Sequence, residues 1–305
     1  MIISENRRPR VSFFMFLVLG LLLVFGCAEP QMEGTPEEVL ERAWKYYALG
    51  EFNAAIGEFT LLKEAVLPDD PFYAQALYGL GTTWNLRRPR NDPDTAREYY
   101  LAVLEHRPGG ELAAYSLLAL ARMKHLVPVG QDPDYDEVRD AYRRVVDQFP
   151  DHPAGHEAFI YLQSTHVATL DPDHARKAIH ALRDFMARYP DTGFISAAWS
   201  LKAIAYDTLG DPDNKLTAEI MAFKTEEVDP QNPFHDNAWR YWSIAVVAEF
   251  DAGDFETART YYRRLIEEYP TDIRKYSATQ ALERMDEKEA HLRAHIAAQD
   301  KGGAP

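Results

Sequence analysis

Proline recurs along the chain at an almost constant interval. Six prolines lie 40, 42, 40, 40 and 40 residues apart, at Pro68, Pro108, Pro150, Pro190, Pro230 and Pro270. A period of this size is typical of a solenoid, in which each repeat buries its apolar face against its neighbours. Proline lacks a backbone N–H and disfavours the α region for the preceding residue, so a helix is expected to end there. The spacing therefore predicts an all-α chain of helix pairs, with a proline after each second helix.

One local pattern is shared by two distant segments, YALGEFNAAIGEF (47–59) and FDAGDFETARTYY (250–262). In each, a glycine suits the left-handed turn that closes a helix. Ala55 and Ala258 are expected where two helices cross closely. Phe59 and Tyr262, one turn further on, would fill the gap against the neighbouring helix.

This pattern resembles the tetratricopeptide repeat (TPR), which has an alanine early in its second helix, an aromatic four residues later and a terminal proline. Four further copies keep this order with some substitutions: Ala96, Tyr100 and Pro108; Val138, Tyr142 and Pro150; Ala178, Leu182 and Pro190; and Ala218, Ala222 and Pro230. The resemblance implies about six helix pairs over residues 36–285. A polar C-terminal capping helix and tail would follow over residues 286–305.

The period is longer than the roughly 34 residues of a TPR and close to that of HEAT repeats, which are the rival assignment. The spacing within GEFNAA and GDFETA favours TPR, because the extra residues fall elsewhere, in long turns such as RRPRNDPDTA.

The amino terminus has the pattern of an export signal. Arg7, Arg8 and Arg10 precede an uncharged apolar run, Val11–Gly26. A basic segment followed by a short apolar one is typical of a secretory signal, and the run is shorter than the roughly 20 residues of a membrane-spanning helix. Cys27, the single cysteine, follows directly and excludes an intramolecular disulfide.

The segment Val24-Phe25-Gly26-Cys27 resembles the lipobox of bacterial lipoproteins. The resemblance implies a signal peptide over residues 1–26, acylation of Cys27 and a tether over residues 27–35. Ala28 after the cysteine implies export to the outer membrane, facing the periplasm. The alternative is an uncleaved signal anchor in the inner membrane.

Composition and motifs argue against several functions. The formal net charge is −15, and the sequence has no basic stripe for nucleic acid. It has no phosphate loop, dinucleotide fingerprint or nucleophile elbow, so we expect no enzyme, catalytic residue, cofactor or small-molecule substrate. Gly79 and Gly81 within YGLGTTW are interpreted as packing positions. Pro153 separates His152 from His156, and His291 and His295 lie on a polar tail, so no metal site is expected.

The TPR resemblance implies that the first helix of each pair lines a concave groove. Ala55 and Gly81 set the register, which assigns five groove residues: Trp44, Tyr47, Gln75, Tyr78 and Asn85. A core position for Trp44, under the tether, is the competing interpretation. Two other tryptophans, Trp239 and Trp242, are expected to pack in the core.

These features together indicate a lipid-anchored scaffold for protein–protein interactions in the bacterial cell envelope. They are similar to those of the TPR lipoproteins of the outer-membrane β-barrel assembly machinery, so barrel-assembly proteins are candidate partners. The alternatives are a cell-wall module that binds or coordinates peptidoglycan glycans, and an accessory subunit of an envelope enzyme.

Overall fold

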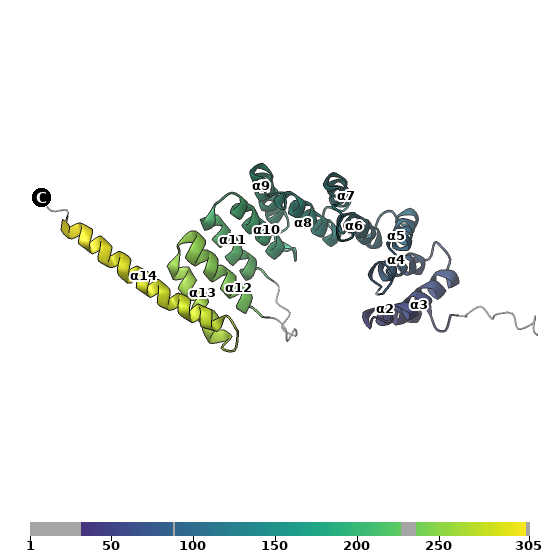
Figure 1. The fold of residues 1–305 in the computed structure, drawn as a ribbon. Helices are drawn as coiled ribbons and strands as arrows, with labels where there is room; N and C mark the ends of the chain where they lie inside the picture. The colour runs from purple at the N-terminus through teal and green to yellow at the C-terminus, as the bar shows by residue number, and fades with distance from the viewer. Residues whose placement is uncertain (1–31, 88, 227–235, 303–305) are drawn as a thin grey trace, which may run out of the picture. The chain divides into compact units, whose positions relative to one another are not determined.

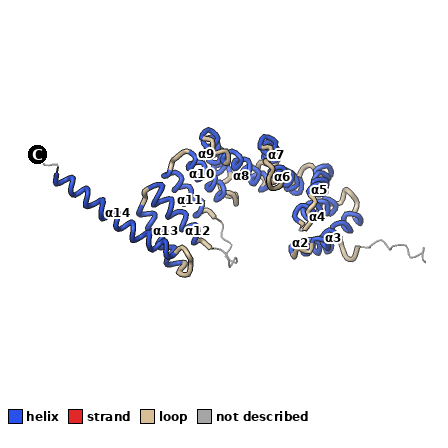
Figure 2. The backbone as a smooth tube through the Cα atoms, in the orientation of Figure 1, coloured by secondary structure: helices blue, strands red, loops and turns tan. Residues whose placement is uncertain are grey.

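The computed structural model describes residues 32–87, 89–226 and 236–302, and within these ranges it contains helices and no strand (Figures 1 and 2). The helices form six consecutive pairs and a long final helix, which confirms the all-α prediction. They are α2 (Pro36–Ala48) and α3 (Phe52–Ala65); α4 (Pro71–Leu86) and α5 (Pro93–His106); α6 (Glu111–His125) and α7 (Tyr135–Gln148); α8 (Pro153–Val167) and α9 (Pro172–Arg188); α10 (Ile195–Thr208) and α11 (Pro212–Lys224); α12 (Ala238–Val246), continued by the π-helical turn η1 (Val247–Ala252), and α13 (Phe255–Glu268); and α14 (Lys275–Gly302).

The chain divides into two compact units, and the division falls within α6. Unit 1 ends at Ser116 and unit 2 begins at Leu117. The helix α14 runs without interruption through residues 285 and 286, where the sequence suggested that the solenoid ends and the capping helix begins.

The second helices end just before prolines, as predicted. The second helices α3, α5, α7, α9 and α13 each stop two or three residues before a periodic proline, and Pro230 lies outside the described residues. The first helix starts with a capping box. The Glu38 carboxylate accepts a hydrogen bond from the Thr35 backbone N–H at 2.8 Å, and the Glu38 N–H donates to the Thr35 hydroxyl at 3.3 Å.

The core of unit 1 is built on close helix crossings. Ala55 and Phe59 of α3 are fully buried, as the repeat register predicted. The Phe59 ring packs against Gly79 of α4 so closely that a Cβ there would lie 2.3 Å from a ring carbon. Gly81 faces the ring of Tyr100 on α5 in the same way, at 2.9 Å. Both glycines are therefore packing positions, as predicted.

Unit 2 ends in a core shared by α12, η1, α13 and α14. Ala258 and Tyr262 are fully buried there, which confirms the register of the last repeat. The expectation that Trp239 is a core residue is wrong: its side chain is 48% exposed, because α12 turns it away from the helices that cover its neighbours. Trp242 packs against the cluster and is partly buried.

A buried ion pair lies in the same region. Glu249 of η1 has a fully buried carboxylate, and the Arg284 guanidinium of α14 donates to both of its oxygens at 2.7 Å. The Tyr262 hydroxyl donates to the same carboxylate at 3.1 Å. The contact ties the final helix to the π-helical turn.

None of the described helices is both long enough and apolar enough to cross a membrane. Cys27 and the apolar run before it lie outside the described residues. Across the described chain, no three His, Cys, Asp or Glu side chains are grouped so that they could hold a metal ion. The two histidines around Pro153 have separate contacts: the His152 ring accepts from the Ala154 N–H, and His156 Nδ1 lies 3.0 Å from the Thr192 hydroxyl.

Candidate binding pocket

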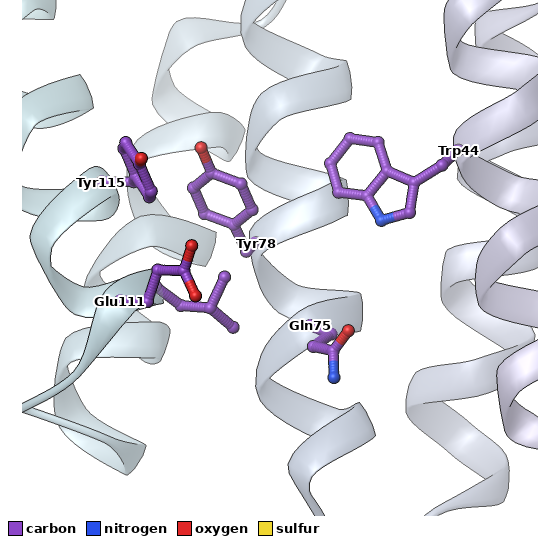
Figure 3. Close-up of a pocket in the computed structure, with 6 residues that line it drawn as sticks. Trp44, Gln75, Tyr78, Glu111 and Tyr115 are labelled. Carbon is purple, nitrogen blue, oxygen red and sulfur yellow. The ribbon is translucent and has the colours of Figure 1, made fainter. Parts of the chain in front are cut away.

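The first helices of three consecutive pairs enclose a pocket in unit 1 (Figure 3). Its volume is about 220 Å³, and it is lined by Trp44 of α2, Gln75 and Tyr78 of α4, and Glu111, Leu112 and Tyr115 of α6. Residues three or four apart on a helix share a face, so α4 presents two side chains to the pocket and α6 presents three. Figure 3 shows the Tyr78 ring between those of Trp44 and Tyr115.

Trp44 belongs to both the pocket and the core. Its ring is partly buried and meets the fully buried Phe59 ring edge to face, with centroids 5.0 Å apart. The rest of the ring lies toward Tyr78, with centroids 6.3 Å apart, and lines the pocket. Both interpretations of this residue therefore describe part of its environment, and its substitution would affect packing as well as the pocket.

Two of the five predicted groove residues lie beside the pocket and do not line it. The Tyr47 ring packs against Trp44, with centroids 5.4 Å apart, and burial, followed by the nearby Tyr78, raises the pKa of its hydroxyl. Asn85 hydrogen-bonds Tyr100, whose pKa burial raises to about 12. Tyr47 therefore supports the pocket wall through Trp44, and Asn85 contacts the core at Tyr100, whereas Trp44, Gln75 and Tyr78 are brought together in the pocket.

The sequence interpretation missed the wall that α6 contributes. A signal for it exists in the burial pattern of the helix. The buried residues of α6 follow the spacing of those on α4. On α4 they are Leu77, Leu80 and Gly81, and on α6 they are Ala114, Leu117 and Leu118, followed by Ala121. Aligning Leu118 with Gly81 places Leu112 and Tyr115 at the positions of Gln75 and Tyr78. The register was set from Ala55 and Gly81, which belong to the first two pairs, and α6 has Leu118 where α4 has the glycine.

A second hollow, of about 550 Å³, lies at the start of α3, where Gly50–Ala54 face Arg87, Pro89 and Arg90. It is formed by the turn before α3, the first residues of α3 and the turn after α4. Its lining includes one acidic residue, Glu51, and two basic ones, Arg87 and Arg90. The smaller pocket is the better candidate because it uses equivalent positions of successive repeats, as solenoid binding surfaces do.

Comparison with known proteins identifies the repeats. Two tetratricopeptide-repeat family models match, one over residues 40–111 and one over residues 241–272. The first match spans the helices that form most of the pocket. It also favours TPR over HEAT, the rival suggested by the period.

Solved structures share the fold. Pseudomonas aeruginosa PilF superposes with a TM-score of 0.52 at 15% identity, covering 81% of this chain and 96% of its own. The RpL4 assembly chaperone Acl4 gives a TM-score of 0.45 at 16% identity, over 85% of this chain and 100% of its own. No curated protein sequence matches. Residues 40–111 and 241–272 therefore match tetratricopeptide repeats, and the likeness to PilF shows that the chain folds as a solenoid of helix pairs.

Proposed function

We propose that this chain is a lipid-anchored scaffold that binds other proteins in the bacterial cell envelope through the pocket of unit 1. The TPR fold is typically a non-catalytic scaffold for protein interactions. The observation that carries the proposal is the pocket itself, where Trp44, Tyr78 and Tyr115 gather between three successive first helices. Aromatic anchors of this kind contribute about 2 kcal/mol or more each in many interfaces, and a groove between helices accepts a helix or an extended peptide.

The lipid anchor rests on the sequence, because residues 1–31 lie outside the described structure. The basic segment, the apolar run and Cys27 support cleavage before the cysteine and its acylation. Several acyl chains would hold the protein stably at a membrane, where a single chain gives only marginal binding. The intact mass of the protein from its native membrane tests this. A mass that retains residues 1–26, or that lacks acyl groups, refutes the anchor. Cys27→Ala should abolish acylation.

The process we favour is the assembly of outer-membrane β-barrels, supported by the similarity of the lipobox and of the repeats near 40 residues. A photo-crosslinking amino acid at Gln75, inside the pocket, should capture barrel-assembly proteins from intact envelopes. The same group at Glu105, exposed on the second helix α5, is the matched control. Cell-wall fragments at Gln75 would instead support the cell-wall module, and equal capture at both positions would refute the pocket as the binding site.

A further inference from the structure

The lining of the pocket has a distinct charge character. Among its six residues, Trp44, Tyr78 and Tyr115 supply aromatic rings and Glu111 supplies a carboxylate, while none is cationic. The negative face of an aromatic ring attracts a cation held within about 6 Å of its centre. A positive group in the pocket would therefore lie among three aromatic rings and a carboxylate, in a chain whose net charge is −15.

The size of the pocket limits what it accepts. Its volume of about 220 Å³ is several times the roughly 30 Å³ that one water molecule occupies in the liquid. It is smaller than the ~300–1,000 Å³ of pockets that enclose drug-sized molecules. The space therefore suits one long side chain of a partner protein.

The chain already uses this chemistry in unit 2, again on the first helices of pairs. On α10, the Lys202 ammonium lies 3.9 Å from the centre of the Trp199 ring and 5.8 Å from that of Tyr206. On α12, the Arg240 guanidinium lies 4.2 Å from the centre of the Trp239 ring. In unit 1, the ring contacts of Trp44 are to Tyr47, Phe59 and Tyr78, which are all aromatic.

We propose that the pocket of unit 1 receives a lysine or arginine side chain from an extended segment of the partner protein, an inference that rests on the proposed scaffold function. The cation lies against the rings of Trp44 and Tyr78 and pairs with Glu111. The Gln75 carboxamide hydrogen-bonds the backbone of the bound segment. An acidic side chain would be repelled by Glu111, and an aliphatic one would desolvate that carboxylate without pairing it.

The test selects peptides from a library of displayed linear random peptides on the purified full-length protein in detergent. We expect the enriched peptides to share one Lys or Arg position. Replacing an enriched Arg by citrulline, its neutral analogue, should weaken binding roughly tenfold, the combined scale of a cation–π contact and a charge pair with the exposed Glu111.

Glu111→Gln should weaken the arginine peptide to a similar extent and leave the citrulline peptide unchanged. Glu105→Gln removes the same charge from an exposed site outside the pocket and should change neither. Enriched peptides that lack a common cation, but lose binding in Tyr78→Ala, would overturn this inference and leave the scaffold function standing. A library that yields no enriched peptide, together with equal crosslinking at Gln75 and Glu105, would overturn both.

Discussion

The two compact units treat their aromatic side chains differently. In unit 2, the chain's own cations cover rings on the first helices, as Lys202 does for Trp199 and Arg240 does for Trp239. In unit 1, the Trp44 ring lines an open pocket beside Tyr78. Unit 1 also has a covered ring on a first helix, since the Arg87 guanidinium lies 5.1 Å from the centre of the Trp84 ring. The difference therefore lies at Trp44, whose ring contacts other aromatic rings at the edge of the pocket.

Ion pairs show a parallel difference. The Glu249 carboxylate of unit 2 is fully buried and depends on Arg284, whereas the Arg42–Glu58 pair of unit 1, at 2.7 Å, keeps both side chains partly exposed. This ion pair of unit 2 therefore depends on internal charge compensation at Glu249.

The largest effect is expected from Arg284→Ala. This change leaves the Glu249 carboxylate buried with the Tyr262 hydroxyl as its remaining partner, which should destabilise unit 2 by about 3–5 kcal/mol. Arg42→Ala is the matched change in unit 1 and should cost about 0–1 kcal/mol, because water can solvate Glu58. Hydrogen exchange, read separately for each unit, measures both. If both variants lost the same free energy of unfolding, the Arg284–Glu249 and Arg42–Glu58 pairs would not differ in their contribution to stability.

The next effect concerns packing, which we expect to be alike in the two units. Ala55→Trp in unit 1 and Ala258→Trp in unit 2 both overfill a crossing where the alanine is fully buried. Each should cost about 1–3 kcal/mol or more. Glu256→Trp, two residues from Ala258 on the exposed face, should be nearly silent in thermal unfolding. A silent Ala55→Trp would show that unit 1 packs loosely at this crossing.

The sequence was sufficient for the features that local rules control. Periodic prolines located the ends of the second helices, and the Ala55 and Ala258 registers located the crossings, because both depend on residues close in the chain. From Ala55 and Gly81 the same register placed Trp44, Gln75 and Tyr78, which the structure brings into one pocket.

Features set by distant contacts were not predictable in this way. The exposure of Trp239 depends on which helices cover α12, and its cover by Arg240 depends on side-chain direction. The Glu111 and Tyr115 wall was missed because the groove register was set from Ala55 and Gly81 in the first two pairs, and α6 has Leu118 in place of the glycine. The burial of Glu249 follows from a π-helical turn, which the sequence does not signal.

Mild acid should lower the stability of unit 2 more than that of unit 1. In unit 2, burial lowers the pKa of His156 below its usual 6.5, and its buried Nε2 has no hydrogen-bond partner among the described residues. Above about pH 6.5, His156 is neutral in both states and its full contribution to the stability of unit 2 is present. As the pH falls below that value, the unfolded chain binds the proton more readily than the folded chain, so unit 2 loses stability. In unit 1, hydrogen bonds from Thr95 lower the pKa of the Asp92 carboxyl below its usual 3.8. The stability that these hydrogen bonds give unit 1 is therefore lost only at a pH below about 3.8.

Hydrogen exchange between pH 7.5 and 5.5 should therefore show faster opening in unit 2 than in unit 1. His156→Phe keeps a ring against Tyr189, which the histidine meets with centroids 4.2 Å apart, and should reduce this acid sensitivity. An unchanged pH slope in the variant would assign the effect to other groups.

The smallest effect is expected from Lys202→Met, which removes the cation from Trp199 in unit 2 without opening a large space. Burial, and then the nearby Arg183 charge, lowers the pKa of Lys202 below its usual 10.5, so its charged form carries a cost that the aromatic contact offsets. The cost of burying the ammonium charge and the gain from the cation–π contact are of similar size. The net change in stability at pH 7 should therefore stay within about 1 kcal/mol.

The pH dependence gives this substitution a sharper readout. Because the folded lysine loses its proton before the unfolded chain does, the stability of the wild type relative to Lys202→Met should rise as the pH approaches 10.5. Buried tyrosines such as Tyr262, whose pKa is raised, lower the stability of both proteins alike in this range. Lys63→Met is the control in unit 1, where the ammonium lies 5.9 Å from the centre of the Tyr99 ring, and it should leave the rise intact. A loss of several kcal/mol in Lys202→Met at pH 7 would mean that the internal cation is a major stabiliser of unit 2. The pocket of unit 1 would then be expected to gain more than tenfold from a partner's cation, which the citrulline peptide measures directly.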